Sequence, residues 1–261
     1  MANCCLIEKR RNGNCKGEKD ALDNKLILPY PKALTESVFI ERPNRFVIHC
    51  RISGTEEVEA VHLPDPGRLK ELLIPGKKVW LLNNENPNRK TKWTAVLCEE
   101  SPGNFVSINT NYPNQLVDKC LRNGVMEEFS GWQYKKAEFT LGRSRWDFLL
   151  SDKDGNELLL EVKSVTLVDE RKGMFPDAVT ARGTKHVKEL ARLAAESSYK
   201  TAVLFVVQRE DADLVVPAAH IDPVFAEALK EAEQAGVKLF ARTCRISLDE
   251  IALGRPIPVV V

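Results

Sequence analysis

The chain has 261 residues, and its 38 Lys and Arg against 37 Asp and Glu give a formal net charge of +1. A content of 43% hydrophobic and 29% charged residues is ordinary for a globular protein, and the near-neutral total lacks the positive charge of many nucleic-acid-binding proteins. No apolar run approaches the roughly 18 residues that predict a membrane span. The first 20 residues hold charges but no apolar signal-peptide core, so we expect a cytoplasmic protein without membrane contact.

The seven cysteines are odd in number, scattered, and without any C-x-x-C pair. A disulfide framework or a zinc site would need close, paired spacing. Cys50, Cys98 and Cys244 stand inside apolar runs typical of strands, which predicts buried thiols. The sequence therefore predicts no metal site built from cysteine.

Residues 1–25 are polar and aperiodic, which predicts a disordered extension. The next part, 26–110, is rich in short strand-like runs separated by Gly, Pro and Asn. The runs expected to be strands are 45–52, 58–63, 77–82, 93–99 and 105–109. One short helix is expected between Asp65 and Pro75, with Pro66 in its first turn. About five short strands and one helix predict a small β-barrel of the OB type.

The remaining part of the chain, 111–261, changes character and predicts a second domain. Strands are expected at 134–140, 144–151, 157–168, 202–207 and 237–246, and helices at 115–121, 185–196 and 222–235. Hairpin strands followed by alternating helices and strands are typical of a mixed sheet covered by helices. The predicted fold is therefore a two-domain α+β and α/β protein, with an N-terminal OB-like barrel and a C-terminal mixed-sheet domain.

The most informative segment is the predicted hairpin 145–163, in which apolar and charged residues alternate on both strands. Placing the apolar side chains of both strands on the same face requires a loop with an odd number of residues, for example three. This register puts Asp147 opposite Lys163 and Glu161 opposite Leu149. Two carboxylates and a lysine on one face can hold Mg²⁺ or Mn²⁺ and place an ammonium beside a metal-bound water. The alternative is an ordinary ion pair on a solvated face.

A second candidate element is the segment 177–186, which has the sequence DAVTARGTKH. Thr184 is the expected N-cap of a helix, Arg182 precedes it, and Lys185 and His186 follow. A helix N-terminus surrounded by basic side chains is a natural phosphate site, so these three basic residues are candidate DNA contacts. The alternative is a plain cap followed by a surface histidine.

Positive charge is concentrated locally although the total is near zero. The segment 77–92 holds five Lys and Arg and one acid, and 163–192 holds seven Lys and Arg against four acids. In contrast, 209–233 holds seven acids against two bases. Lys77 and Lys78 are therefore further candidate DNA contacts.

Six stretches of the chain resemble the sugar fermentation stimulation protein family, within the span 30–261. They are HLPDPGRLKELLIPG (62–76), VSINTNYPNQLV (106–117), GRSRWDFLL (142–150), LLLEVKSVTL (158–167), MFPDAVTARGTKHVKEL (174–190) and LFVVQR (204–209). The resemblance implies an OB-like N-terminal domain and a C-terminal domain similar to the restriction-endonuclease-like PD-(D/E)XK nucleases. It also implies DNA binding without strong sequence preference and a role in regulating sugar (maltose) metabolism. We expect no organic cofactor.

The resemblance also implies roles for particular residues. By motif, Asp147 corresponds to the aspartate of the nuclease pattern, and Glu161 and Lys163 correspond to its E-x-K. Glu138 is implied as an upstream acid that completes the metal ligands, and Gln208 as a later polar helper in catalysis.

Two positions depart from the family's pattern. Trp146, rather than Pro, precedes Asp147, which changes no ligand. Asp65 stands where the family's motif has Asn, so the resemblance implies no base or phosphate contact for this residue. Arg68, in the same motif, remains a candidate DNA contact.

Three functions are compatible with these features. The first is DNA binding by the OB-like face and the basic segment before the 185–196 helix, with Trp80 and Trp93 either stacking on bases or packing in the core. The second is a Mg²⁺-dependent nuclease that uses the predicted carboxylates and lysine. The third is an interaction protein that docks a partner through the acidic helix 222–235. We take DNA binding as the main function and leave the strandedness of the DNA and the oligomeric state open.

Overall fold

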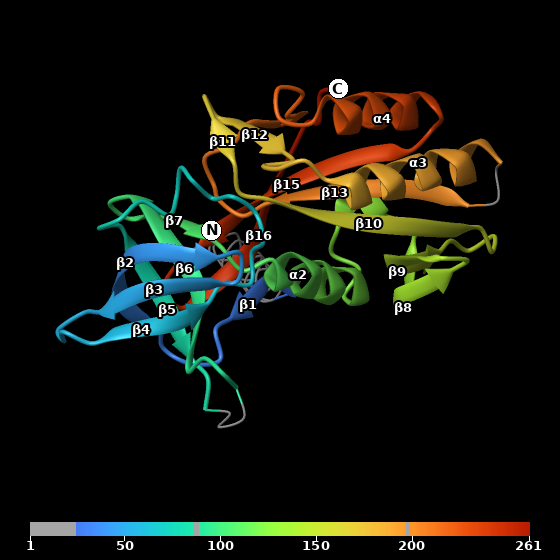
Figure 1. Cartoon of the computed structure of the whole chain (residues 1–261). Helices are drawn as coiled ribbons and strands as arrows, with labels where there is room; N and C mark the ends of the chain where they lie inside the picture. Colours follow the sequence, from blue (N-terminus) through green and yellow to red (C-terminus); the bar gives the residue numbers. More distant parts are fainter. Residues whose placement is uncertain (1–24, 86–88, 197–198) are drawn as a thin grey trace, which may run out of the picture.

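Figure 1 shows the computed structural model of the chain, which describes residues 25–85, 89–196 and 199–261. The extension predicted to be disordered, 1–25, lies outside the described residues except for Lys25. No helix within the described ranges is long and apolar enough to cross a membrane.

The N-terminal part of the chain forms a β-barrel. Its strands are β2 (Thr35–Asn44), β3 (Val47–Ile52), β4 (Val58–His62), β5 (Lys78–Asn83), β6 (Trp93–Ser101) and β7 (Asn104–Ser107). They pair in the order β4-β3-β2-β5-β6-β7, and an additional parallel pairing of β4 with β6 closes the sheet on itself. Closure pairs strand edges that would otherwise be open. The prediction of an OB-type barrel is confirmed.

Both tryptophans considered for base stacking are buried. Trp93 is 7% exposed and belongs to the core inside the barrel. Trp80 is 5% exposed and contacts Phe105 edge to face, with 5.0 Å between ring centroids. Core packing is therefore the correct interpretation of both.

The short helix predicted to start at Asp65 is wrong, because the chain makes turns there instead. The Arg42 guanidinium donates to the backbone carbonyls of Asp65 and Arg68, which a helix would pair with its own N–H groups. Leu69 has a φ of 49°, which is incompatible with a right-handed helix. Asp65 Oδ1 accepts the backbone N–H of Gly67 at 2.8 Å, but this bond closes a turn.

The C-terminal part is a seven-stranded mixed sheet between helical layers. Its strands, in spatial order, are β1 (Ile27–Pro29), β16 (Glu250–Ile257), β15 (Lys238–Ile246), β13 (Lys200–Val207), β10 (Glu157–Val165), β9 (Ser144–Ser151) and β8 (Gln133–Leu141). The central strands β10, β13 and β15 are parallel, and the outer pairings are antiparallel. A small second sheet consists of β11 (Val168–Asp169), β12 (Lys172–Phe175) and β14 (Leu214–Pro217). The predicted mixed-sheet α/β domain is confirmed.

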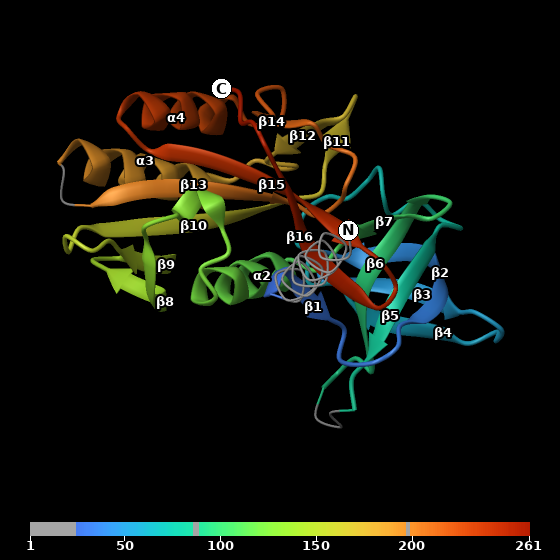
Figure 2. The same cartoon turned by 180° about the vertical axis from the view of Figure 1, so that it is seen from behind.

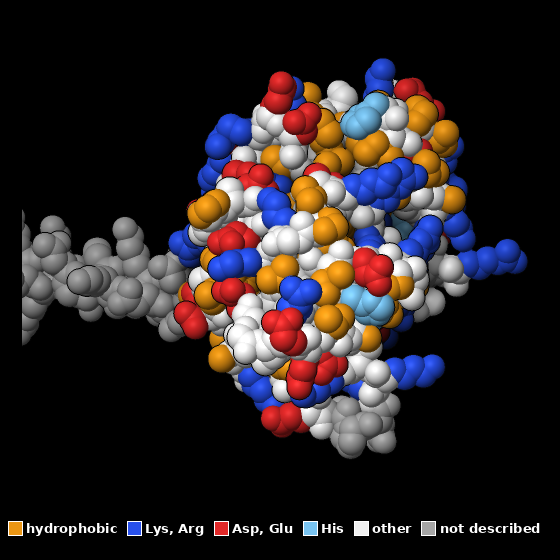
Figure 3. Space-filling view, turned by 60° about the vertical axis from the view of Figure 1, so that its left-hand side comes forward, with side chains coloured by type: hydrophobic (Ala, Val, Ile, Leu, Met, Phe, Trp, Pro, Cys, Tyr) orange, Lys and Arg blue, Asp and Glu red, His pale blue; other side chains and the backbone are white. Residues whose placement is uncertain are grey.

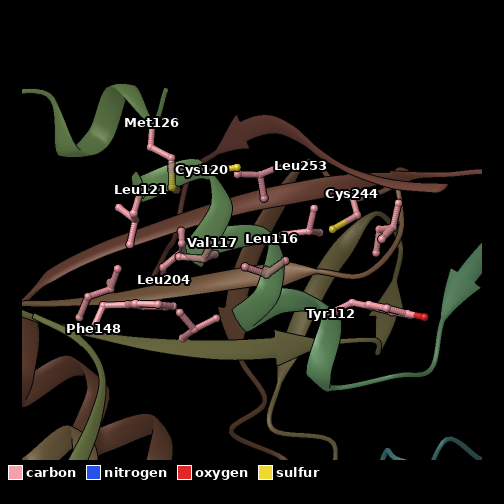
Figure 4. Packing of buried hydrophobic residues seen from close by; sticks show 14 of the residues in the cluster. Tyr112, Leu116, Val117, Cys120, Leu121, Met126, Phe148, Leu204, Cys244 and Leu253 are labelled. Atoms are coloured by element: carbon pink, nitrogen blue, oxygen red, sulfur yellow. The ribbon is translucent and has the colours of Figure 1, made fainter. Parts of the chain in front are cut away.

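One face of the large sheet is covered by α2 (Asn111–Arg122), which is followed by a short 3-10 turn, η1 (Glu127–Phe129) (Figure 1). Figure 4 shows the apolar stripe of α2 packed against side chains of the sheet; its labelled members from α2 are Tyr112, Leu116, Val117, Cys120 and Leu121. The predicted burial of Cys50, Cys98 and Cys244 is also confirmed, since all three are fully buried.

The other face is covered by α3 (Ala181–Ala195) and α4 (Pro223–Gln234), which lie side by side in both Figure 1 and Figure 2. The helix α3 begins earlier than predicted, because its N-cap is Thr180, whose hydroxyl accepts the N–H of Gly183 at 3.1 Å. Thr184, the predicted cap, lies inside the first turns of the helix. His186 is consequently on the second turn and faces the sheet.

The predicted start of the OB-like domain at residue 26 differs from the structure. The strand β1 pairs with β16, so residues 27–29 form an edge of the C-terminal sheet before the chain enters the barrel. Lys119 of α2 donates to the carbonyl of Ile27 at 2.5 Å and fastens this segment. A three-residue edge strand is too short to leave a periodic signal in the sequence.

Candidate functional site

The strands β9 and β10 separate at the residues predicted to hold a metal ion. Their antiparallel pairing ends with Leu160 opposite Phe148, and the next residues in that register are Glu161 and Asp147. The side chain of Asp147 fills the resulting gap, since its Oδ2 accepts the backbone N–H of Val162 at 2.7 Å. The separation of the strands thus brings two carboxylates together between them.

The predicted register of this hairpin is wrong by two residues. Glu161, and not Lys163, follows in register with Asp147. The loop has five residues, and Asp152 holds it by accepting two of its backbone N–H groups at 2.9 Å each. A shift of two residues leaves every side chain on its original face, so the apolar pattern could not distinguish the two registers.

Asp147 lies in an environment that opposes its negative charge. Burial, and after it the neighbouring charge of Glu161, raise the pKa of Asp147 to about 6. Two hydrogen bonds act in the opposite direction, one from Val162 and one from Asn114 Nδ2 on α2 to Asp147 Oδ1 at 2.7 Å. Asp147 is therefore held in a fixed orientation with much of its charge uncompensated.

Glu161 is compensated from two sides. One oxygen, Oε1, accepts from Lys163 Nζ at 2.6 Å and from His186 Nδ1 at 2.8 Å. Burial alone would raise the pKa of Glu161, but the bonds from His186 and Lys163 outweigh it and hold the pKa below its usual range. Glu161 is therefore ionised at neutral pH and only 5% exposed.

Two carboxylates on neighbouring strands form a hard-oxygen donor set of the kind that Mg²⁺ and Ca²⁺ take in proteins. Mg²⁺ is commonly held by one or two carboxylates with water completing its shell, so Asp147 and Glu161 fit such an ion. In the part of the chain that the structure describes, no group of three or more His, Cys, Asp or Glu is arranged around one point. Glu138, the predicted third ligand, does not join the pair, because its side chain is 70% exposed and lies 3.6 Å from Arg145.

A cleft of about 940 Å³ lies between the barrel and the C-terminal domain, lined by residues from both. The lining includes Asn114 and Val162, which bond to Asp147, and Lys163, which bonds to Glu161. The carboxylate pair therefore lies directly behind the cleft floor. The charged residues of the lining are Arg42, Arg45, Arg68, Lys70, Lys163 and Arg182, against Asp65 and Asp177. On the face shown in Figure 3, by contrast, positive, negative and apolar side chains are intermixed.

The structure divides the predicted DNA contacts into two groups. Arg68 and Arg182 line the cleft from opposite domains. Lys77, Lys78 and Lys185 do not line it; Lys77 donates to the carbonyl of Glu100, and Lys78 lies 3.2 Å from Glu36 on the barrel. His186 is 7% exposed, so the alternative of a surface histidine is wrong, and its partner is Glu161.

Gln208, predicted as a polar helper in catalysis, lies at the junction of the two domains. It is fully buried, accepts from Ser107 Oγ of the barrel at 2.8 Å and donates to Ser164 Oγ of β10 at 2.8 Å. Its backbone carbonyl also accepts the N–H of Ser107 at 3.0 Å. These bonds join the two walls of the cleft next to Lys163.

Comparison with known proteins agrees with this architecture. The model described as "SfsA N-terminal OB domain" matches residues 40–108, and the model "Sugar fermentation stimulation protein RE domain" matches residues 111–250. The chain belongs to the sugar fermentation stimulation protein family. The family homologue of Shouchella clausii is 51% identical over 87% of this chain and 98% of its own length, and that of Moorella thermoacetica is 39% identical over 88% and 97%.

A solved structure of the sugar fermentation stimulation family has the same fold. It is SfsA of Pyrococcus furiosus in complex with Ca²⁺, which matches with a TM-score of 0.81 at 29% identity and covers 90% of this chain and 98% of that one. The resemblance inferred from the six sequence stretches is therefore confirmed, together with the OB domain and the restriction-endonuclease-type domain.

Three residues of the site were not found by sequence reasoning. Asn114 orients Asp147 from α2, Arg42 braces the loop that carries Arg68, and Asp177 accepts the backbone N–H of Arg68 at 2.7 Å across the domain junction. Asn114 and Asp177 belong to stretches that resemble the sugar fermentation stimulation family, so those stretches held a signal. Their partners are 33 and 109 residues away in sequence, and only the fold reveals them.

Asp65 is a second buried acid in the cleft, and its replacement by Asn tests the electrostatics of the lining. Burial, and to a lesser extent the charge of Asp177, raise the pKa of Asp65 from 3.8 to about 6. Since the folded-state pKa lies above the unfolded one, the folded protein loses stability as the pH rises from about 4 to 6. Asp65→Asn keeps an oxygen for Gly67, so we expect it to stabilise the protein by on the order of 2–3 kcal/mol at pH 8 and by little at pH 3.5.

Urea denaturation of wild type and Asp65→Asn at both pH values measures this difference. An equal effect on stability at pH 3.5 and pH 8 would show that the charge of Asp65 is not its cause.

Proposed function

We propose that the chain binds DNA without strong sequence preference, in the cleft between its two domains. The observation that carries the proposal is the lining of this cleft, where six Lys and Arg face two acids in a chain of nearly zero net charge. Basic side chains that neutralise phosphates supply affinity that carries no sequence information. Hydrogen bonds from Arg68 to Asp177 and through Gln208 link the two domains that form the cleft.

A role in regulating sugar (maltose) metabolism stays a prediction that would follow from such binding. The name of the relatives links them to sugar fermentation. The six Lys and Arg side chains among the residues that line the cleft suit a polyanion better than a neutral sugar.

DNA binding in the cleft is tested by removing positive charge from it. Arg68→Ala and Arg182→Ala are each expected to weaken binding on every sequence alike and to reduce the slope of log affinity against log salt by about 1. Fluorescence anisotropy with labelled single- and double-stranded oligonucleotides measures the affinity and the salt slope. Salt concentrations from roughly 50 to 200 mM are suitable, because affinities of this kind change strongly over that range.

Two control variants locate the surface. Lys153→Ala removes an exposed positive charge in the β9–β10 loop, outside the cleft lining, and is expected to leave the salt slope unchanged. Lys78→Ala removes a charge on the barrel surface. If Lys78→Ala lowers the slope and the two arginine variants do not, DNA binds on the barrel and the cleft proposal is wrong.

A second function, metal-dependent hydrolysis of phosphodiester bonds, is favoured by the position of Lys163 in the lining of the same cleft, with its partner Glu161 and Asp147 directly behind it. When bound by the two carboxylates, Mg²⁺ or Mn²⁺ would polarise a phosphoryl oxygen and lower the pKa of a bound water. The Ca²⁺ complex of the Pyrococcus furiosus relative supports divalent-cation binding in the family.

The protein residues would orient the reactants. Asn114 and the N–H of Val162 fix Asp147, and Lys163 stands between Glu161 and the cleft. The Lys163 ammonium would therefore hold the attacking water or stabilise the negative charge that develops on the phosphate. Cleavage assays on DNA and RNA with Mg²⁺ or Mn²⁺ test this function. If the wild type cleaves none of these substrates, hydrolysis is excluded and DNA binding stands alone.

A further inference from the structure

The side chain of His186 has a position that neither DNA binding nor hydrolysis uses directly. It extends from α3 toward β10, is 7% exposed, and is absent from the residues that line the cleft. Its Nδ1 lies 2.8 Å from Oε1 of Glu161, on the face of the sheet that α3 covers. His186 therefore reaches the carboxylate from inside the protein, whereas Lys163 lines the cleft.

The ring of His186 is fixed by its surroundings. The indole of Trp146 packs against it with 5.4 Å between ring centroids, at an angle of 59°. The helix that carries it is held by the Thr180 cap and by a hydrogen bond from Ser144 on β9 to Glu189. Glu161 is the only hydrogen-bond partner of the His186 ring among the described residues, and a buried polar group without a partner is unfavourable, so the pairing is favoured.

The two donors meet at the same oxygen of Glu161. Oε1 accepts from both Lys163 and His186, while Oε2 has no hydrogen-bond partner among the residues that the structure describes. A carboxylate bonded in this way cannot rotate without breaking one of the two bonds. Lys163 has a long, flexible side chain, so the rigid imidazole is the donor that fixes the plane of the carboxylate.

We propose that His186 is a positioning residue for a metal ligand. Its Nδ1–H donates to Glu161 Oε1 and so keeps Oε2 of Glu161 available for the cation. The inference rests on the proposed binding of a divalent cation by Asp147 and Glu161. It requires a proton on Nδ1, because an ionised carboxylate can only accept. Loss of such an outer partner of a metal ligand typically costs about 10–100-fold in metal affinity.

Two substitutions separate positioning from simple core packing. In His186→Asn the amide nitrogen is at the δ position, the same number of bonds from the backbone as Nδ1. In His186→Gln it is one bond farther out, at the position of Nε2. We expect His186→Asn to bind Mn²⁺ or Ca²⁺ within a few-fold of wild type, and His186→Gln and His186→Ala to bind about 10–100-fold more weakly.

Isothermal titration with Ca²⁺ and electron paramagnetic resonance of Mn²⁺ measure the affinities without relying on cleavage. Lys188→Gln, an exposed change on the same helix, is the control and should bind as the wild type does. If the asparagine and glutamine variants bind equally, His186 does not position Glu161 and the inference is wrong. If the wild type itself binds no cation, the proposed metal site fails first, which is a different result.

A measurement on the wild type keeps the inference testable where a variant does not fold. Nuclear magnetic resonance of ¹⁵N-histidine protein reports which ring nitrogen of His186 carries a proton. We expect a protonated Nδ1, and a shift of the His186 signals when Ca²⁺ is added. An unprotonated Nδ1 would overturn the inference.

Discussion

Replacing Asp147 by Asn is expected to abolish divalent-cation binding while stabilising the metal-free protein. The loss of affinity should exceed the roughly 10–100-fold that removal of an outer partner costs, because Asp147 supplies one of the two carboxylates of the proposed metal site. Asn114 can turn its amide and bond to the new side chain, and an oxygen remains for the N–H of Val162. Any Mg²⁺-dependent cleavage is therefore expected to disappear without loss of the fold.

The gain in stability follows from the raised pKa of Asp147. Its folded-state pKa of about 6 lies above the usual 3.8, so ionised Asp147 opposes folding at neutral pH. Asp147→Asn is expected to raise the free energy of unfolding by on the order of 2–3 kcal/mol at pH 7, and by little at pH 3.5. Denaturation in urea with chelator present, and calorimetric titration with Mn²⁺, measure the two effects. Asp154→Asn, an exposed change in the same hairpin, should alter neither, and a destabilised Asp147→Asn would contradict this account.

Replacing Gln208 by Ala is expected to destabilise the protein by about 2–4 kcal/mol. The change leaves a cavity at a fully buried position and removes the partners of two serine hydroxyls, Ser107 and Ser164. Since the lost bonds join the walls of the cleft, DNA affinity should fall together with stability. Urea denaturation and fluorescence anisotropy provide the two measurements.

Gln133→Ala, an exposed change on β8, provides the control and is expected to shift stability by less than about 0.5 kcal/mol. The result also separates two roles for Gln208. If Gln208→Ala keeps wild-type stability and DNA affinity but loses cleavage, the residue acts in catalysis, as its place in the family's motif implies. A loss of stability with weakened binding assigns it to the domain junction.

The strand pattern and the charged hairpin could be predicted because they depend on local periodicity. Apolar alternation placed most strands of both domains and put Asp147, Glu161 and Lys163 in one hairpin. The register could not be predicted, since a shift of two residues preserves every face and the deciding bonds come from Asp152 in the loop. Trp146 and Phe148 are two residues apart on one strand, which predicts the same face for both. They lie in opposite cores because β9 leaves β10 at this point.

Contacts between distant segments explain the other differences. The turn after Asp65 has the composition of a helix start, but the Arg42 guanidinium takes the carbonyls that a helix would need. The sequence predicts a phosphate contact for His186 from its place near a helix N-terminus. The cap lies four residues earlier than expected, at Thr180, and this places the imidazole against Glu161. Such side-chain contacts depend on tertiary structure and leave no periodic signal.

The central claim is that a divalent cation and DNA occupy the same cleft. If it is correct, binding of one ligand should change the affinity for the other. By thermodynamic linkage the two changes are the same factor. The most direct test is the affinity for labelled DNA, measured by fluorescence anisotropy with and without Ca²⁺, for wild type and Asp147→Asn. We predict that Ca²⁺ tightens DNA binding by the wild type and has no effect on the variant. An equal response of the two proteins, or no response of the wild type, would contradict the account.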